Sequence, residues 1–250
     1  MKKSLLIRKA HRYLGLFIGI QFLAWTVSGL YFSWNNIDDV HGDHLRKPPA
    51  FLNDLDSIVS PAQALLAVNA VKRVDSVHSI NLIKVLSAPV YQVKYFSGHA
   101  GEGIHLHTHV ALVDAQKGTI RQPLTESEAV AIAKQNVVPN AEVVSTQYLS
   151  ATDGHHEYRE KPLPAWAIEF KDPNCTAYIS AELGTFQSIR HNQWRAFDFL
   201  WMFHTMDYNT RDNFNNLLLK AFSLFGLITV VSGFALFIVS SRTLKKISSL

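Results

Sequence analysis

Three histidines occupy alternate positions in the segment GIHLHTHVALVDAQKGTI, residues 103–120: His105, His107 and His109. If this segment is an extended strand, the three side chains project from one face, because side chains alternate between faces along a strand. Neighbouring imidazoles would then be about 6–7 Å apart, twice the rise per residue, so two of them could converge on one ion. Imidazole nitrogen suits zinc, copper, nickel or iron, and the pattern predicts a transition-metal site on these three histidines.

The same three histidines allow two other interpretations. One is a solvated sheet face that happens to carry histidine, which is favoured because no Cys/His spacing typical of a zinc site accompanies them. The other is a pH-sensitive surface, because unperturbed histidine titrates at about pH 6.5. Further candidate ligands, His99, His155 and His156, lie in segments expected to be loops.

Two long segments near the ends of the chain carry no charge. They are residues 13–34, YLGLFIGIQFLAWTVSGLYFSW, and residues 221–241, AFSLFGLITVVSGFALFIVSS. A helix that crosses a bilayer needs about 20 apolar residues, so each segment is long enough to span. A buried helix of a soluble protein is the alternative, and the lengths favour two transmembrane helices.

Charged residues beside these segments predict their orientation. Both outer ends are basic, and the positive-inside rule then places both termini in the cytoplasm and residues 35–216 outside it. The first segment is too long for a signal peptide and no small-x-small site follows it, so we expect an uncleaved anchor. The predicted location is a bacterial inner membrane, with a lipid bilayer around the helices and the central domain in the periplasm. The basic residues are Lys2, Lys3, Arg8, Lys9, Arg12, Arg242, Lys245 and Lys246.

Net charge and cysteine content bear on the expected partners and on disulfide bonding. The net charge of +4 comes largely from the two ends, where it orients the chain, so it gives no reason to expect nucleic acid as a partner. Cys175 is the only cysteine, which excludes a disulfide within the chain. We expect a buried thiol without a chemical role.

Two stretches of the central region begin with the same helix signals. In SPAQALLAV, Ser60 suits the N-cap and Pro61 the first helical position. In TESEAVAIA, Thr125 and Glu128 form a capping-box pattern. Apolar residues then recur at helical spacing in both stretches, which predicts two helices.

The same two stretches then continue into strands and a glycine turn. PVYQVKYF (89–96) and PAWAIEF (164–170) alternate as half-buried strands do. VDAQKGTI (113–120) then matches ISAELGTF (179–186), with alanine, glycine and threonine at equivalent positions. The sequence predicts an internal repeat in which one helix packs on a small antiparallel sheet.

These features together resemble the PepSY proteins that carry associated transmembrane helices. The shared marks are RKAHRYLGLFIG before the first span, VSG in both spans, the two helix-then-D-A-x-x-G units, and FLWMFHTMDY before the second span. These marks occur in the same order, and the resemblance covers nearly the whole chain. Members of the family are often described as iron-regulated membrane proteins, some larger relatives are haem-containing reductases of ferric siderophores, and PepSY modules elsewhere bind or inhibit peptidases. This chain has two spans where the larger relatives commonly have four.

The expected fold is therefore a membrane-anchored α+β protein in which two transmembrane helices flank an extracytoplasmic domain of two PepSY-like repeats. Each repeat is expected to contain a helix and an antiparallel sheet. The expected parts are a tail and first span at 1–34, a linker at 35–59, repeat 1 at 60–122, repeat 2 at 123–192, an interfacial aromatic helix at 193–212, and the second span and tail at 213–250.

The resemblance also implies a role for two histidines beside the spans. His11 and His204 occupy positions where larger relatives could place haem ligands. The resemblance therefore implies haem b as one candidate cofactor, and a transition metal is the other. We expect the two at opposite membrane faces, about 30 Å apart, so they could not share one haem. Each haem would need a second histidine from another chain. Otherwise His11 is a headgroup-level residue and His204 a structural hydrogen-bonding residue.

Small residues within the spans predict close helix packing. Gly15 and Gly19 form a G-x-x-x-G pattern, and each span contains a Ser-Gly pair. Small residues let helices approach closely in lipid, so the two spans could form a tight hairpin or the chain a homodimer. The Ser-Gly pairs are Ser28 with Gly29 and Ser232 with Gly233.

The sequence contains no Walker loop, dinucleotide fingerprint, H-E-x-x-H or G-x-S-x-G motif and no paired carboxylates suited to acid–base catalysis. We therefore expect a non-catalytic accessory module of iron or metal handling that binds another membrane or periplasmic protein. One alternative is a haem-carrying subunit of a ferric-siderophore-type reductase system, which would make it part of a membrane oxidoreductase. The other is a regulator of an envelope peptidase.

Overall fold

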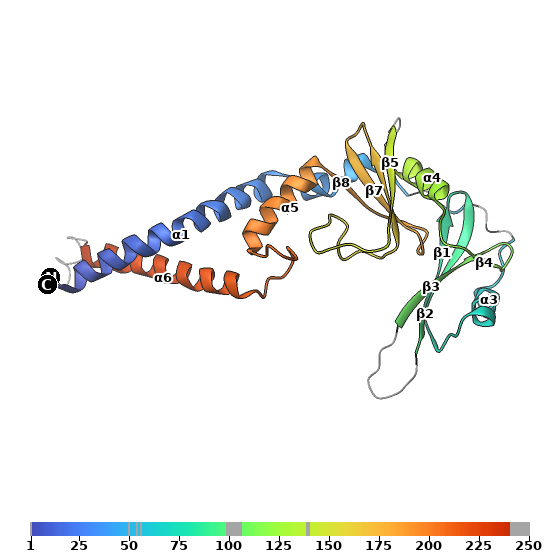
Figure 1. Ribbon diagram of the computed structural model, residues 1–250, viewed down its shortest axis with the longest axis horizontal. Coiled ribbons are helices and arrows are strands. Elements are labelled where there is room, and N and C mark those ends of the chain that lie inside the picture. The colour runs from blue at the N-terminus through green and yellow to red at the C-terminus, as the bar shows by residue number, and fades with distance from the viewer. Residues whose placement is uncertain are drawn as a thin grey trace. The chain divides into compact units, whose positions relative to one another are not determined.

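The computed structural model divides the chain into a helical unit and a two-sheet unit (Figure 1). The helical unit comprises Met1–Ile37 and Arg195–Leu250, and the two-sheet unit comprises Asp38–Trp194. The structure describes residues 2–49, 51–53, 55, 57–98, 107–138 and 141–240.

Two long helices, α1 (Lys2–Trp34) and α6 (Leu217–Ser240), lie side by side in the helical unit (Figure 1). They run antiparallel, and the rings of Phe17 and Phe222 stack with their centroids 5.5 Å apart. Gly226 lets α6 approach α1 closely, because a Cβ at this position would lie 3.1 Å from the Phe22 ring.

Both long helices have the length and composition to cross a membrane. The apolar windows run over Arg8–Trp34 and Leu217–Ile238, and most of their residues are exposed rather than packed inside the protein. A core helix of a soluble protein would bury its apolar side chains, so this exposure argues against that alternative. The prediction of two apolar helices at the ends of an α+β chain is confirmed.

A shorter helix, α5 (Asn192–Thr205), ends beside α1. Trp25 Nε1 donates to the backbone oxygen of His204 at 3.0 Å, and Gln21 Nε2 donates to that of Phe203 at 3.1 Å. These two bonds use the last carbonyls of α5, which have no partner within their own helix. The helix begins one residue before the predicted interfacial segment 193–212 and ends inside it, and its position at a membrane surface stays a prediction.

The two-sheet unit contains two halves with the same order of elements. The first half consists of α3 (Pro61–Val71) and an antiparallel sheet in the order β1-β2-β3-β4, and the second consists of α4 (Glu126–Asn136) and a sheet in the order β5-β6-β7-β8. A short α2 (Ile37–His41) and a 3₁₀ turn (Asp43–Leu45) precede them. The strands are β1 (Ser76–Val85), β2 (Ala88–Ser97), β3 (His107–Asp114), β4 (Ile120–Arg121), β5 (Val143–Leu149), β6 (Ala165–Phe170), β7 (Cys175–Ser180) and β8 (Phe186–His191).

The predicted helix starts of both halves are confirmed. The Ser60 side chain accepts from the backbone of Gln63, and the Thr125 side chain accepts from that of Glu128. In both helices the third residue also accepts from the N-cap backbone, which completes a capping box. Such caps contribute about 1 kcal/mol each, so the two starts are specified locally.

Each helix covers one face of its own sheet with apolar side chains. Ala64 and Val68 of α3 pack against Val93 and Val113 of the first sheet. The second core contains residues of α4 and the second sheet, and it also includes three side chains of the first sheet. The two halves therefore share a core. The shared side chains are Val85, Val90 and Leu112, and Cys175 lies fully buried in the same core.

The two matched glycine turns adopt the same backbone conformation. Gly118 has a φ of +67° and Gly184 a φ of +70°, a region that residues with a Cβ rarely adopt. Gly184 also contacts the other half, because a Cβ there would lie 3.1 Å from Val85 and 3.2 Å from Leu112. The two halves therefore share an order of elements and a glycine turn, and their identity as PepSY-like repeats stays a prediction.

Candidate functional site

Two histidines of the helical unit each contact the serine of a VSG motif on another helix. His11 Nδ1 on α1 lies 2.7 Å from Ser232 Oγ on α6. His204 Nδ1 on α5 lies 2.9 Å from Ser28 Oγ on α1. The serine of each Ser-Gly pair noted in the sequence therefore contacts a histidine of a neighbouring helix.

Each serine hydroxyl also lies within hydrogen-bond distance of backbone carbonyls of its own helix. Ser28 Oγ lies 2.9 and 3.1 Å from the backbone oxygens of Ala24 and Trp25, and Ser232 Oγ lies 2.7 Å from that of Thr229. A hydroxyl has one proton, so it donates either to the carbonyl or to the imidazole, and the tautomer of the histidine decides which. When the serine donates to the carbonyl, His11 and His204 carry the proton on Nδ1 and keep the lone pair on Nε2. This is the form in which histidine ligates a metal, with the other nitrogen held by a partner.

Small and apolar residues surround the His11 ring. A Cβ on Gly233 would lie 3.3 Å from His11 Cε1 and 4.0 Å from Nε2, so glycine lets the His11 ring pack directly against α6. An open apolar hollow of about 520 Å³ lies here, lined by Val230, Gly233, Phe234 and Phe237. Gly233 thus contacts the His11 ring and also lines this apolar hollow.

Aromatic rings surround His204. The ring of Phe32 lies 5.6 Å from the histidine ring and that of Trp201 lies 6.4 Å away, centroid to centroid. Gly29, next to Ser28 in the chain, has open space where a Cβ would be. The two sites therefore share a histidine–serine contact, with glycine packed on the ring at His11 and aromatic rings around His204.

The two histidines are too far apart to share one ligand. His11 lies near one end of α1, and Ser28, which holds His204, comes 17 positions later. At 1.5 Å per residue this is about 25 Å along the helix. The geometry agrees with the expectation that one haem cannot bind both.

Polar groups fix the end of α5 that carries His204. Asp198, which is 3% exposed, pairs with Arg211, and Thr205 Oγ1 donates to the backbone of Arg211 at 3.1 Å. Burial acts to raise the pKa of Asp207, but hydrogen bonds from Thr210 and from backbone N–H groups outweigh it and lower that pKa to about 2. These contacts position the loop directly after His204.

The predicted metal site on alternate histidines is only partly described. His105 and His99 lie outside the described residues, while His107 and His109 lie on β3. The His109 ring is exposed and lies 5.5 Å from the ring of Tyr95. In the described part of the chain, no group of three or more His, Cys, Asp or Glu side chains is placed to hold a metal ion. A metal site at this strand therefore stays a prediction.

The predicted membrane-packing glycines divide into two groups. Gly233 contacts His11 within the chain, whereas a Cβ on Gly15, Gly19 or Gly29 would meet no atom of the described residues within 4 Å. The contacts between α1 and α6 thus depend on glycines of α6. The G-x-x-x-G pattern of α1 is available to another chain, and a homodimer stays a prediction.

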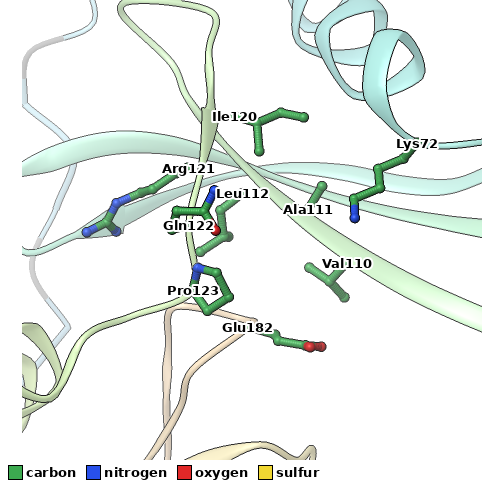
Figure 2. A pocket seen from close by; sticks show the side chains of 9 residues that line it. All are labelled: Lys72, Val110, Ala111, Leu112, Ile120, Arg121, Gln122, Pro123 and Glu182. Atoms are coloured by element: carbon green, nitrogen blue, oxygen red, sulfur yellow. The ribbon is translucent and has the colours of Figure 1, made fainter.

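A second candidate site lies in the two-sheet unit and was not anticipated. A hollow of about 270 Å³ lies beside β3 and β4. Figure 2 shows its lining side chains, among them Lys72, Arg121 and Glu182. Arg121 is engaged, because its guanidinium pairs with Glu128 of α4. The sequence signal that could have revealed this hollow is Pro123, which stops the fourth strand of the first half.

Comparison with known proteins adds no assignment. No family model matches the chain, and no curated protein and no solved structure matches it either.

Proposed function

We propose that this chain is a membrane-anchored haem-carrying subunit that serves iron handling, with its two-sheet unit outside the cytoplasm as a binding module. The observation that carries this proposal is the matched pair of serine-held histidines, His11 with Ser232 and His204 with Ser28. A serine that contacts Nδ1 orients the ring, and a metal-ligating histidine needs such an oriented ring and a free Nε2 lone pair.

The residues present fit haem as the bound group. The Nε2 lone pairs of His11 and His204 would each ligate one haem iron. The apolar hollow at Gly233 and the aromatic rings around His204 would offer apolar surface to the macrocycle. When bound, haem supplies one-electron transfer. Because the two histidines lie about 25 Å apart, we propose two separate haems. The second ligand of each would come from another chain, either a second copy or a partner subunit.

The exposed apolar surface of the long helices supports membrane anchoring. Exposed side chains such as Leu16, Ile20 and Leu23 on α1 and Phe234 on α6 would face water in a soluble protein. In a bilayer the same side chains face lipid at no cost. The basic ends of the chain then favour cytoplasmic termini and a periplasmic two-sheet unit.

A second candidate function is a binding module without a redox role, including regulation of an envelope peptidase. It is favoured by the hollow of the two-sheet unit, which is lined by charged side chains (Figure 2). This hollow belongs to the two-sheet unit, whereas the candidate haem ligands belong to the helical unit. The two candidates differ in whether the helical unit holds a cofactor.

Absorption spectra of the detergent-purified full chain, oxidised and then reduced with dithionite, separate the two candidates. The haem proposal expects a Soret band that shifts on reduction, and metal analysis of the same sample should find iron. His11→Ala and His204→Ala should each remove one share of the band, whereas His155→Ala, in a loop of the other unit, should leave it unchanged. Ser28→Ala and Ser232→Ala should keep haem but shift its reduction potential, because the ligand loses its hydrogen-bond partner.

A full chain expressed with haem available that shows neither a Soret band nor iron would refute the haem proposal. The binding-module candidate would then stand alone. A transition metal without haem would direct attention to His105, His107 and His109.

A further inference from the structure

The two halves of the two-sheet unit differ in the length of their last strand. In the second half, β8 pairs with β7 from Phe186 opposite Ile179 to His191 opposite Cys175. In the first half, β4 contributes only the pairs Leu112↔Arg121 and Val113↔Ile120. Among the described residues, nothing continues β4 along the earlier part of β3.

Pro123 explains why β4 ends early. Asp114 N donates to Thr119 O at 2.9 Å, so the alternate residues Leu112, Val110 and Thr108 turn their backbone groups toward the same edge. The register places Pro123 opposite Val110, and proline has no N–H to donate to the ladder.

After Pro123 the chain joins the second half instead of extending β4. Leu124 N donates to Ala181 O at 2.9 Å, and Leu124 O accepts from Trp166 Nε1 at 3.0 Å. The backbone groups of Val110 and Thr108 are therefore left at the edge of the sheet.

The hollow lies at this edge, and it carries opposite charges on its two sides (Figure 2). Ala111 belongs to the face of β3 that α3 covers, and Lys72 follows the end of α3. Leu112 belongs to the opposite face, which packs against the second half, and Glu182 comes from the β7–β8 turn of that half. No ion pair of Lys72 or Glu182 is found within the described ranges.

We propose that this edge binds an extended segment of a partner protein as an added antiparallel strand beside Val110 and Thr108. An acidic side chain of that segment pairs with Lys72, and the adjacent basic side chain, which points to the other face, pairs with Glu182. In the second half a strand of the chain itself already pairs with the matching edge. There Ile189, Arg190 and His191 of β8 pair with β7.

Strand addition suits this edge on physical grounds. Main-chain hydrogen bonds supply affinity, and contacts to alternate side chains supply specificity. The charges at Lys72 and Glu182 select a segment that carries a neighbouring acid and base. The inference does not depend on haem, since every residue it uses lies in the two-sheet unit.

The test is fluorescence anisotropy with the full chain in detergent and a labelled peptide, Thr-Ile-Val-Glu-Lys-Val-Thr. We expect saturable binding, weakened about tenfold or more when the central amides are N-methylated, because the strand then loses its donors. Lys72→Glu should weaken binding about tenfold and favour a Lys-Lys version of the peptide. Lys117→Glu, an exposed lysine of the neighbouring turn, is the matched control and should have no effect.

Absence of binding would overturn the proposal, as would equal binding of the N-methylated peptide or an unchanged affinity of the Lys72→Glu chain. The His11→Ala chain should bind the peptide with the same affinity as the unaltered chain. A failed haem test and a failed peptide test can therefore be told apart.

Discussion

The helical unit and the two-sheet unit use apolar and polar side chains in opposite ways. In the two-sheet unit, apolar side chains such as Phe170 and Ile168 are fully buried and form shared cores. In the helical unit, large apolar side chains such as Leu23 and Phe234 are exposed, while Ser28 is buried between helices. Burial of apolar side chains therefore stabilises the two-sheet unit, whereas specific polar contacts such as His204–Ser28 define the packing of the helical unit.

The largest effect is expected from removing a core aromatic side chain of the two-sheet unit. Phe170→Ala should destabilise that unit by about 3–5 kcal/mol, because it loses buried area and leaves a cavity. Phe234→Ala in α6, where the side chain is 66% exposed, should leave the stability of the helical unit nearly unchanged in detergent. Hydrogen–deuterium exchange of the β6 and β7 amides measures the first effect, and exchange along α6 measures the second. Similar protection losses at both sites would contradict the contrast.

An intermediate effect is expected from glycines of the two units. Gly184→Ala should cost about 1–2 kcal/mol, because its φ of +70° is unfavourable for alanine and its Cβ would press on Val85. Gly29→Ala in α1 should be neutral or slightly stabilising, because the site is open and alanine favours a helix. Thermal unfolding of the full chain in detergent compares the two variants. An equal loss from both would show that the helical unit also depends on its glycines.

The smallest effect is expected from protonation of Asp207, which should destabilise only the loop after α5. Because the pKa of Asp207 lies at about 2, below its ordinary value of 3.8, its carboxylate stabilises the loop above about pH 4. That stabilisation should be lost as the pH falls from about 4 toward 2. Exchange of the 206–213 amides at a series of pH values measures it, and Asp207→Asn should abolish the dependence. A persistent pH dependence in that variant would assign it to another group.

Features set by neighbouring residues could be predicted from the sequence. The N-caps at Ser60 and Thr125 and the turns at Gly118 and Gly184 depend on a few adjacent positions, and all four are confirmed. The two apolar helices follow from length and composition alone. These signals are local because capping and positive φ are satisfied within one turn of chain.

Features that join distant residues could not be predicted. The contact between His11 and Ser232 crosses almost the whole chain, and nothing in either VSG motif indicates which histidine it meets. The hollow beside β3 depends on where the chain leaves after Pro123, which is determined by contacts of Leu124 with the second half. Periodicity reports the face of an element and not its neighbour, so such pairings require the folded structure.

The core shared by the two halves has a consequence for how the domain can be divided. Val85, Val90 and Leu112 belong to the first sheet by sequence but are buried with α4 and the second sheet. A chain cut after residue 122 would expose these side chains to water, and the remaining half would keep a hole where they had been. We therefore expect the two halves to fold only as one domain, because close packing of this core needs side chains of both.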